Sequence, residues 1–202
     1  MNKKNYLLDL NNSKKSFIIY KSDKGFDLYT DFSKKIILNN KNINEFINKN
    51  TRLKSSHKET DLFIGFFGYE ILNNLIDVKI KKQKTTNFPK GIFYKPEKKI
   101  KLSNNLGCKK TRSSNPNDLF KININKKSYK VIFDKFKKKI KSGETYQIKI
   151  CTKYSNKSKI DALDFFARLV KSNMAPEAFM IKDKDYSIIS CSPENLITKK
   201  NN

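Results

Sequence analysis

The chain contains 202 residues, of which 37% are hydrophobic, with 15 Phe and 9 Tyr. This is enough apolar material for one ordinary domain, or for one small domain and part of another, and it excludes a disordered tail. The longest apolar stretches, such as 62–69, are far shorter than the roughly 20 residues that span a bilayer, and the first residues lack the apolar segment of a signal peptide. We therefore expect a soluble, cytoplasmic protein that does not act at a membrane.

The formal net charge of +25 raises the question of nucleic-acid binding. Only three of the 44 basic residues are arginine, at Arg52, Arg112 and Arg168, whereas base readout and bidentate phosphate binding favour the planar arginine side chain. Lysine is enriched together with asparagine and isoleucine along the chain, which is typical of a coding sequence rich in A and T. The sequence also contains no basic-aromatic motif of a known nucleic-acid-binding fold, so we expect no nucleic-acid partner. A basic nucleic-acid-binding protein is the least supported of the alternative functions.

The cysteines and the histidine do not form a metal or nucleophile motif. Cys108, Cys151 and Cys191 are widely spaced and form no CxxC pair, and His57 is the only histidine. This pattern excludes a zinc site built from Cys and His. His57 lies in the polar stretch 51–60 without a nucleophile pattern, so a Ser-His-Asp or Cys-His device is not expected. Cys151 and Cys191 lie in β-like runs and are expected to be buried free thiols.

Residues 1–102 alternate short strand-like runs with short helices. The near-continuous apolar run at 61–68 predicts a strand that is buried on both faces. The predicted strands are 16–20, 26–30, 35–38, 61–68 and a pair within 91–102 that turns around Pro96 and Glu97, and the predicted helices are 42–50 and 69–76.

Residues 103–127 are rich in Ser, Asn and Lys without sustained periodicity, so they predict a linker, where we place the internal boundary. A helix is predicted from Ser128 as its N-cap to Gly143, with lysines in its last turns as the helix dipole favours. Five residues at helical spacing form one apolar face of this helix: Tyr129, Ile132, Phe133, Phe136 and Ile140.

Strict alternation over 144–154 predicts a strand that places Gln147 on the face opposite Tyr146 and Ile148. Asp161 is expected to cap a second helix, and residues 178–197 predict a hairpin that turns at 183–185. The buried stripe expected on the second helix is Leu163, Phe166, Ala167 and Val170. The mixture predicts an α+β fold with mixed, mainly antiparallel sheets and packed helices.

Three segments, in fixed order, carry a resemblance to a known family: GFFGYEIL at 65–72, KSGETYQIKICTKY at 141–154, and 168–196, which runs from Arg-Leu to Ser-Pro-Glu-Asn-Leu. Taken singly, each has a structural explanation, such as a helix C-cap at Gly143 or a strand bend at Ser192 and Pro193. In order, they resemble component I of anthranilate synthase and of 4-amino-4-deoxychorismate (para-aminobenzoate) synthase. The resemblance covers roughly 61–200 and is best after residue 128.

The resemblance implies a truncated part of the anthranilate synthase component I-like fold. Residues 1–102 correspond to the component I N-terminal domain, 103–127 to a linker, and 128–202 to the start of the chorismate-binding domain. In the family, the acidic residues that hold Mg²⁺ and a catalytic histidine lie on sequence that follows the Ser-Pro-Glu motif, which is Ser192, Pro193 and Glu194 here. The resemblance therefore implies that this chain carries no metal ligands. We therefore expect a fragment, a truncated frame or a decayed copy, whose 202 residues alone do not turn over chorismate.

Gln147 carries the most chemical information within the resemblance. In relatives that make isochorismate or salicylate, the matching position is a lysine that activates water. An amide has no titratable pair of states near pH 7 and cannot act as that base, so Gln147 indicates the branch that uses ammonia from a glutamine amidotransferase partner. Such enzymes displace the chorismate 4-hydroxyl, as in folate biosynthesis, or add at C2 and lose pyruvate, as in tryptophan biosynthesis. Both branches stay open.

The segment Asn173, Met174, Ala175, Pro176 and Glu177 aligns with the family's tryptophan effector pocket. Glu177 stands where the family has a tyrosine, which weakens stacking against an indole, so tryptophan feedback is not expected. The sequence leaves three functions open: a component I lyase or transferase, a non-catalytic interaction module of the same family, and a nucleic-acid-binding protein.

Overall fold

We analysed the protein as a computed structural model that describes residues 3–13, 15–50, 58–71, 88–106, 120–157, 160–192, 194–195 and 197. The chain forms two compact units, and the larger unit combines the two ends of the chain. Residues 1–109 and 161–202 form unit 1, and residues 110–160 form unit 2. The boundaries expected from the sequence, 1–102, 103–127 and 128–202, do not coincide with these units, because strands that follow residue 176 join the sheet of the N-terminal strands.

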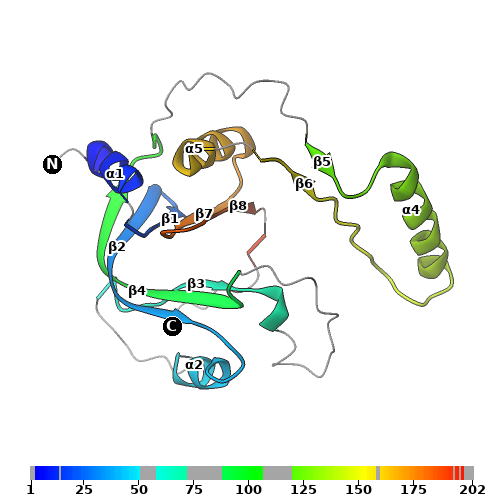
Figure 1. The fold of residues 1–202 in the computed structure, drawn as a ribbon, viewed down its shortest axis with the longest axis horizontal. Coiled ribbons are helices and arrows are strands. Elements are labelled where there is room, and N and C mark those ends of the chain that lie inside the picture. The colour runs from blue at the N-terminus through cyan, green and yellow to red at the C-terminus, as the bar shows by residue number, and fades with distance from the viewer. Residues whose placement is uncertain are drawn as a thin grey trace. The chain divides into compact units, whose positions relative to one another are not determined.

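Unit 1 is built on one six-stranded sheet whose strands all pair antiparallel in the order β3-β4-β2-β1-β7-β8 (Figure 1). The α+β class expected from the sequence is confirmed. The strands are β1 (Phe17–Ser22), β2 (Gly25–Ile37), β3 (Ile64–Phe67), β4 (Gly91–Leu102), β7 (Glu177–Lys182) and β8 (Ser187–Ser192). The helices of this unit are α1 (Lys3–Asn12), α2 (Ile43–Asn50), the 3₁₀ helix η1 (Tyr69–Ile71) and α5 (Ala162–Asn173).

Two breaks predicted from the sequence are absent, because β2 and β4 are each one long strand. The predictions of separate strands at 26–30 and 35–38, and of a strand pair around Pro96, are therefore wrong. The register shifts between Phe32, which pairs with Pro96, and Lys34, which pairs with Lys95, so Ser33 is the extra residue of a β-bulge. Proline lacks an N–H and is tolerated at such a bulge, and the Ser33 hydroxyl donates to the Lys95 carbonyl over 3.3 Å.

The apolar run at 61–68 forms an edge strand rather than a strand buried on both faces. Within the described part of the chain, β3 pairs only with β4, and Phe67 is 51% exposed. The run is apolar because its two faces contact different clusters: Ile64 and Phe66 pack beside Tyr94, and Phe63 packs beside Phe46 of α2. Of the helix predicted at 69–76, the structure describes residues 69–71, which form η1. The remainder lies outside the described residues.

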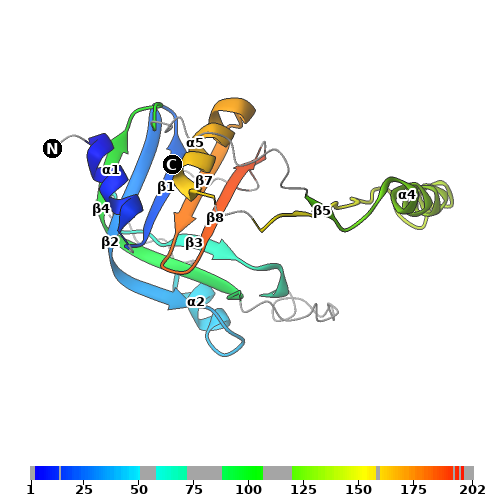
Figure 2. The same ribbon diagram turned by 45° about the horizontal axis from the view of Figure 1, so that its top comes forward.

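The largest core lies between the sheet and the two helices α1 and α5, which cover the same face of the sheet (Figures 1 and 2). Leu7 of α1 and Phe166 of α5 meet Phe17 and Met180 of the sheet there. The predicted N-cap of α5 is confirmed, because the Asp161 carboxylate accepts a hydrogen bond from the Asp164 N–H over 2.8 Å. The hairpin predicted around 183–185 is also confirmed, as β7 and β8 pair along their whole length.

Unit 2 contains α4 (Lys126–Lys141) and the two-residue strands β5 (Lys121–Ile122) and β6 (Tyr154–Ser155). The N-cap of α4 is Asn125 rather than Ser128, because the Asn125 side chain accepts from the Ser128 N–H over 2.8 Å. The strand predicted at 144–154 is wrong except at its end, since residues 144–153 belong to no strand. A segment with an alternating pattern forms a strand only where it pairs with another strand, and β5 pairs with only two residues, Tyr154 of this segment and Ser155, which follows it.

Among the described residues, no helix is long and apolar enough to cross a membrane.

Candidate functional site

The connection between α5 and β7 holds the segment expected to resemble an effector pocket. α5 ends at Asn173, and Met174 takes the left-handed conformation (φ 45°) while its N–H donates to the Val170 carbonyl over 3.1 Å. Met174 is exposed and Ala175 is buried. The turn therefore directs the chain from the helix into the sheet at Glu177.

The side chain of Glu177 is held by two neutral donors. The Tyr20 hydroxyl donates to one Glu177 oxygen over 2.5 Å, and the Asn195 amide donates to the other over 3.3 Å. Burial and the hydrogen bond to Glu177 raise the pKa of Tyr20 to about 12. Beside this pair, the Lys21 ammonium donates to the Ala175 carbonyl. The Glu177 carboxylate is thus engaged within the protein, by Tyr20 of β1 and by Asn195.

The Ser-Pro-Glu motif lies at the same end of the sheet. Ser192 is opposite Glu177 in the pairing of β8 with β7, and the Ser192 hydroxyl accepts from the Glu194 N–H over 3.2 Å. Pro193 lies outside the described residues. The structure therefore brings Glu177, Ser192 and Asn195 together, although the sequence placed the first two in separate motifs.

Gln147 belongs to unit 2, whereas the other candidates belong to unit 1. The Gln147 side chain is exposed, and the main-chain carbonyl of Gln147 accepts from the Thr145 hydroxyl over 3.3 Å. Ile148 and Ile150 are half-buried while Gln147 and Lys149 are exposed, but Tyr146, which was expected on the same face as Ile148, is 90% exposed, so the predicted alternation holds only over 147–150.

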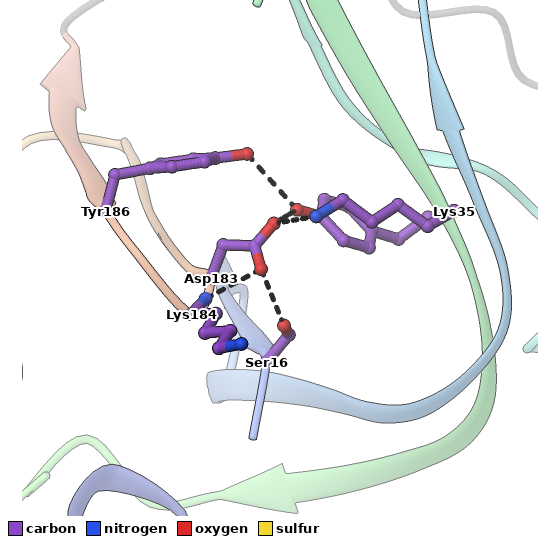
Figure 3. A network of polar contacts seen from close by, with 6 residues as sticks. Ser16, Lys35, Asp183, Lys184 and Tyr186 are labelled. Atoms are coloured by element: carbon purple, nitrogen blue, oxygen red, sulfur yellow. Dashed lines mark hydrogen bonds and ion pairs between the residues drawn. The ribbon is translucent and has the colours of Figure 1, made fainter. Parts of the chain in front are cut away.

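A buried polar network around Asp183 was not anticipated from the sequence (Figure 3). One carboxylate oxygen of Asp183 accepts from the Ser16 hydroxyl over 3.0 Å and from the Lys184 N–H over 2.7 Å. The other oxygen accepts from the Lys35 ammonium over 2.5 Å and from the Tyr94 hydroxyl. The sequence predicted Asp183 only as a turn residue of the β7–β8 hairpin. The one local signal for its role is its position at the start of the turn, where an aspartate carboxylate often accepts a hydrogen bond from a main-chain N–H.

The electrostatics of this network indicate a structural anchor. Burial opposes ionisation of Asp183, but the hydrogen bonds from Lys35 and Tyr94 outweigh it and hold its pKa well below the usual range. Burial and the bond to Asp183 raise the pKa of Tyr94 well above its usual value. Neither group changes protonation near neutral pH, so neither serves as a general acid or base there. The network instead ties the hairpin to β2, β4 and the start of β1.

In the described part of the chain, no three His, Cys, Asp or Glu side chains are grouped so that they could hold a metal ion. The expected Mg²⁺ therefore has no fitting ligand set among these residues. His57 and Cys108 lie outside the described residues. The prediction of buried thiols is wrong for Cys151, which is exposed because its segment pairs with no strand. Cys191 is half-buried, and burial raises the pKa of its thiol.

Comparison with known proteins provides an independent test of the resemblance. Residues 3–202 match the family described as "chorismate binding enzyme". Anthranilate synthase component 1 of Buchnera aphidicola subsp. Pemphigus spyrothecae is 32% identical over 99 residues, which are 49% of this chain and 19% of that relative. The chain thus aligns with about a fifth of the relative's length, while the family match covers both compact units.

Proposed function

The chain belongs to the chorismate-binding enzyme family, and from this premise we propose that it acts as component I of a synthase that aminates chorismate. The ammonia comes from a glutamine amidotransferase subunit, as the similarity to an anthranilate synthase component 1 suggests. The observation that carries the proposal is the family match over 3–202, because it includes the segment around Gln147 and the Ser192–Glu194 motif.

Gln147 supports ammonia rather than water as the nucleophile. Water must lose a proton as it attacks, and a neutral amide cannot take that proton near pH 7. Ammonia attacks with the free electron pair of its neutral form, and the ammonium group that results releases its proton to water after the bond has formed, so no base is required during the attack. The amide oxygen of Gln147 can accept a hydrogen bond from ammonia and orient it toward the ring.

We expect Gln147→Lys to change the product mixture in the protein produced with whatever sequence flanks these residues in its gene. The lysine should slow the ammonia reaction and introduce traces of isochorismate by water addition. The effect depends on how far neighbours lower the pKa of the new lysine toward neutrality. Chromatography with mass detection, on chorismate and an ammonium salt, measures both products.

Lys149→Gln is the matched control, because Lys149 is an exposed side chain of the same extended segment. It should leave the ratio of products unchanged. If Gln147→Lys gives the same rate and the same products as the unmodified protein, Gln147 is a surface residue and its proposed role is wrong. Binding of the amidotransferase without any turnover of chorismate would favour the non-catalytic interaction module instead.

A further inference from the structure

α1 is a helix that its own sequence does little to stabilise. Its ten residues include three asparagines and one aspartate, which disfavour a helix interior. Lys3 and Lys4 place positive charge in the first turn, and no basic residue of α1 lies in its last turn, so the sequence does not complement the helix dipole at either end. An isolated helix in water needs about 12–15 residues to be stable. We therefore attribute the formation of α1 to its docking on the rest of unit 1.

The docked face of α1 is small. Of its ten residues, Leu7 and Leu10 are buried, and Tyr6 and Leu8 pack beside them while partly exposed. These two leucines are two of the 13 buried residues of the core cluster between the sheet and the helices, and the rest come from the strands, from α5 and from the chain that follows β4. Most of this core stays assembled when α1 leaves it, so the release of α1 is a local opening rather than global unfolding.

Asn11, in the last turn of α1, joins three elements through one side chain. Its amide nitrogen donates to the Asp161 carboxylate at the start of α5 over 2.9 Å, and its amide oxygen accepts from the Lys182 ammonium of β7 over 3.0 Å. Lys182 also donates to the main-chain carbonyl of Asn11, so β7 supplies the cation that the last turn of α1 lacks. Making both side-chain contacts requires a donor and an acceptor in one group, as in an amide.

Both connections between unit 1 and unit 2 begin at residues that contact the region of α1. Unit 2 consists of residues 110–160, so the chain leaves unit 1 after β4 and returns to it at Asp161. On the leaving side, Leu106 is 5% exposed and belongs to the core cluster of the two α1 leucines. On the returning side, one carboxylate oxygen of Asp161 caps α5 and the other accepts from Asn11. The two ends of the inserted unit are therefore both held where α1 docks.

We propose that α1 is a detachable clasp: it is helical only while docked, and its release frees both connections to unit 2 at once. Gln147 belongs to unit 2. The clasp therefore sets how tightly the segment that carries Gln147 is tethered to the sheet of unit 1. The contacts that form the clasp lie within unit 1 and do not depend on which reaction the protein performs.

Hydrogen exchange followed by mass spectrometry tests the clasp in the protein produced with its flanking sequence. The amides of α1 should exchange faster than those of β1 and β2, because α1 opens locally. Asn11→Ala should speed the exchange of α1 and of the first turn of α5 about fivefold, since it removes two hydrogen bonds to charged partners. The control Asn12→Ala makes the same chemical change at the next, exposed residue of α1 and should alter the exchange by less than about twofold.

Two further measurements separate the clasp from a simple weakening of α5. Asp161→Ser keeps a residue type that caps helices but removes the oxygen that accepts from Asn11. It should therefore also speed the exchange of α1, because coupling between two sites is reciprocal. Under chymotrypsin, a fragment that ends at Leu106 should appear sooner from Asn11→Ala than from Asn12→Ala, because cleavage there requires Leu106 to leave the core.

Three results would overturn the clasp. Exchange of α1 that is no faster than that of β1 and β2 would show that α1 is a fixed part of the core. Equal exchange in Asn11→Ala and Asn12→Ala would show that the Asn11 side chain does not hold α1. Faster exchange of α1 without earlier cleavage at Leu106 would show that the release of α1 leaves that connection in place.

Discussion

Asp183→Ala is expected to lower the free energy of unfolding by about 3–5 kcal/mol, because it removes the acceptor from a buried, charge-assisted network. The Asp183 carboxylate accepts from Ser16, Lys35, Tyr94 and the Lys184 N–H. Of these donors, the Tyr94 side chain is buried, so its hydroxyl loses its charged acceptor without access to bulk water. Chemical denaturation followed by circular dichroism measures the change.

Asp185→Ala is the matched control. Asp185 lies two residues further along the same turn and is exposed, so its removal should change the free energy of unfolding by less than about 0.5 kcal/mol. Equal stability of the two variants would show that the Asp183 network does not anchor the hairpin.

The Asp183 network also predicts how the free energy of unfolding depends on pH. The folded pKa of Asp183 lies below its value in the unfolded chain, about 3.9. Its contribution to stability is therefore complete above about pH 4 and is lost as the pH falls toward the folded pKa. The Asp183→Ala protein should lose less stability over that acid range than the unmodified protein does.

Phe166→Ala is expected to destabilise the protein by about 3–5 kcal/mol, because it empties the centre of the core between α5 and the sheet. Phe166 is 0% exposed, and its ring meets that of Phe26 edge-on with centroids 5.9 Å apart. Leu7 of α1 and Met180 of β7 belong to the same cluster, so the cavity would loosen helices from both ends of the chain.

Phe165→Ala gives the control for this change within one helix. Phe165 is the preceding residue of α5 and is 40% exposed. The same chemical change there should cost clearly less, about 1–2 kcal/mol, since the Phe165 ring is already partly in water and its removal leaves no enclosed cavity. Similar losses for the two variants would contradict the placement of α5 against the sheet.

Local signals in the sequence predicted those parts of the fold that depend on neighbouring residues. The Asp161 N-cap and the turn of the β7–β8 hairpin are of this kind, and the structure contains both. The bulge at Ser33 could not be predicted, because it exists only where two distant strands, β2 and β4, are paired. The alternation of 144–154 was misleading for the converse reason: a strand requires a partner, and the described residues provide one only at Tyr154 and Ser155.

The candidate site was predictable only as separate motifs. The sequence pointed to Glu177 and to Ser192, but their pairing across β7 and β8 and the contact of Tyr20 with Glu177 result from the sheet topology. The Asp183 network joins residues that are more than 140 positions apart, such as Lys35 and Asp183. No local pattern reports such a contact, so it became visible only in the folded chain.

The most direct test of the proposed function is the fate of chorismate supplied with ammonium labelled with heavy nitrogen. The protein should be produced with whatever sequence flanks residues 1–202 in its gene, and the products identified by mass spectrometry. We predict that the label appears in anthranilate or in 4-amino-4-deoxychorismate. Formation of isochorismate or salicylate without the label, or no consumption of chorismate at all, would contradict the account.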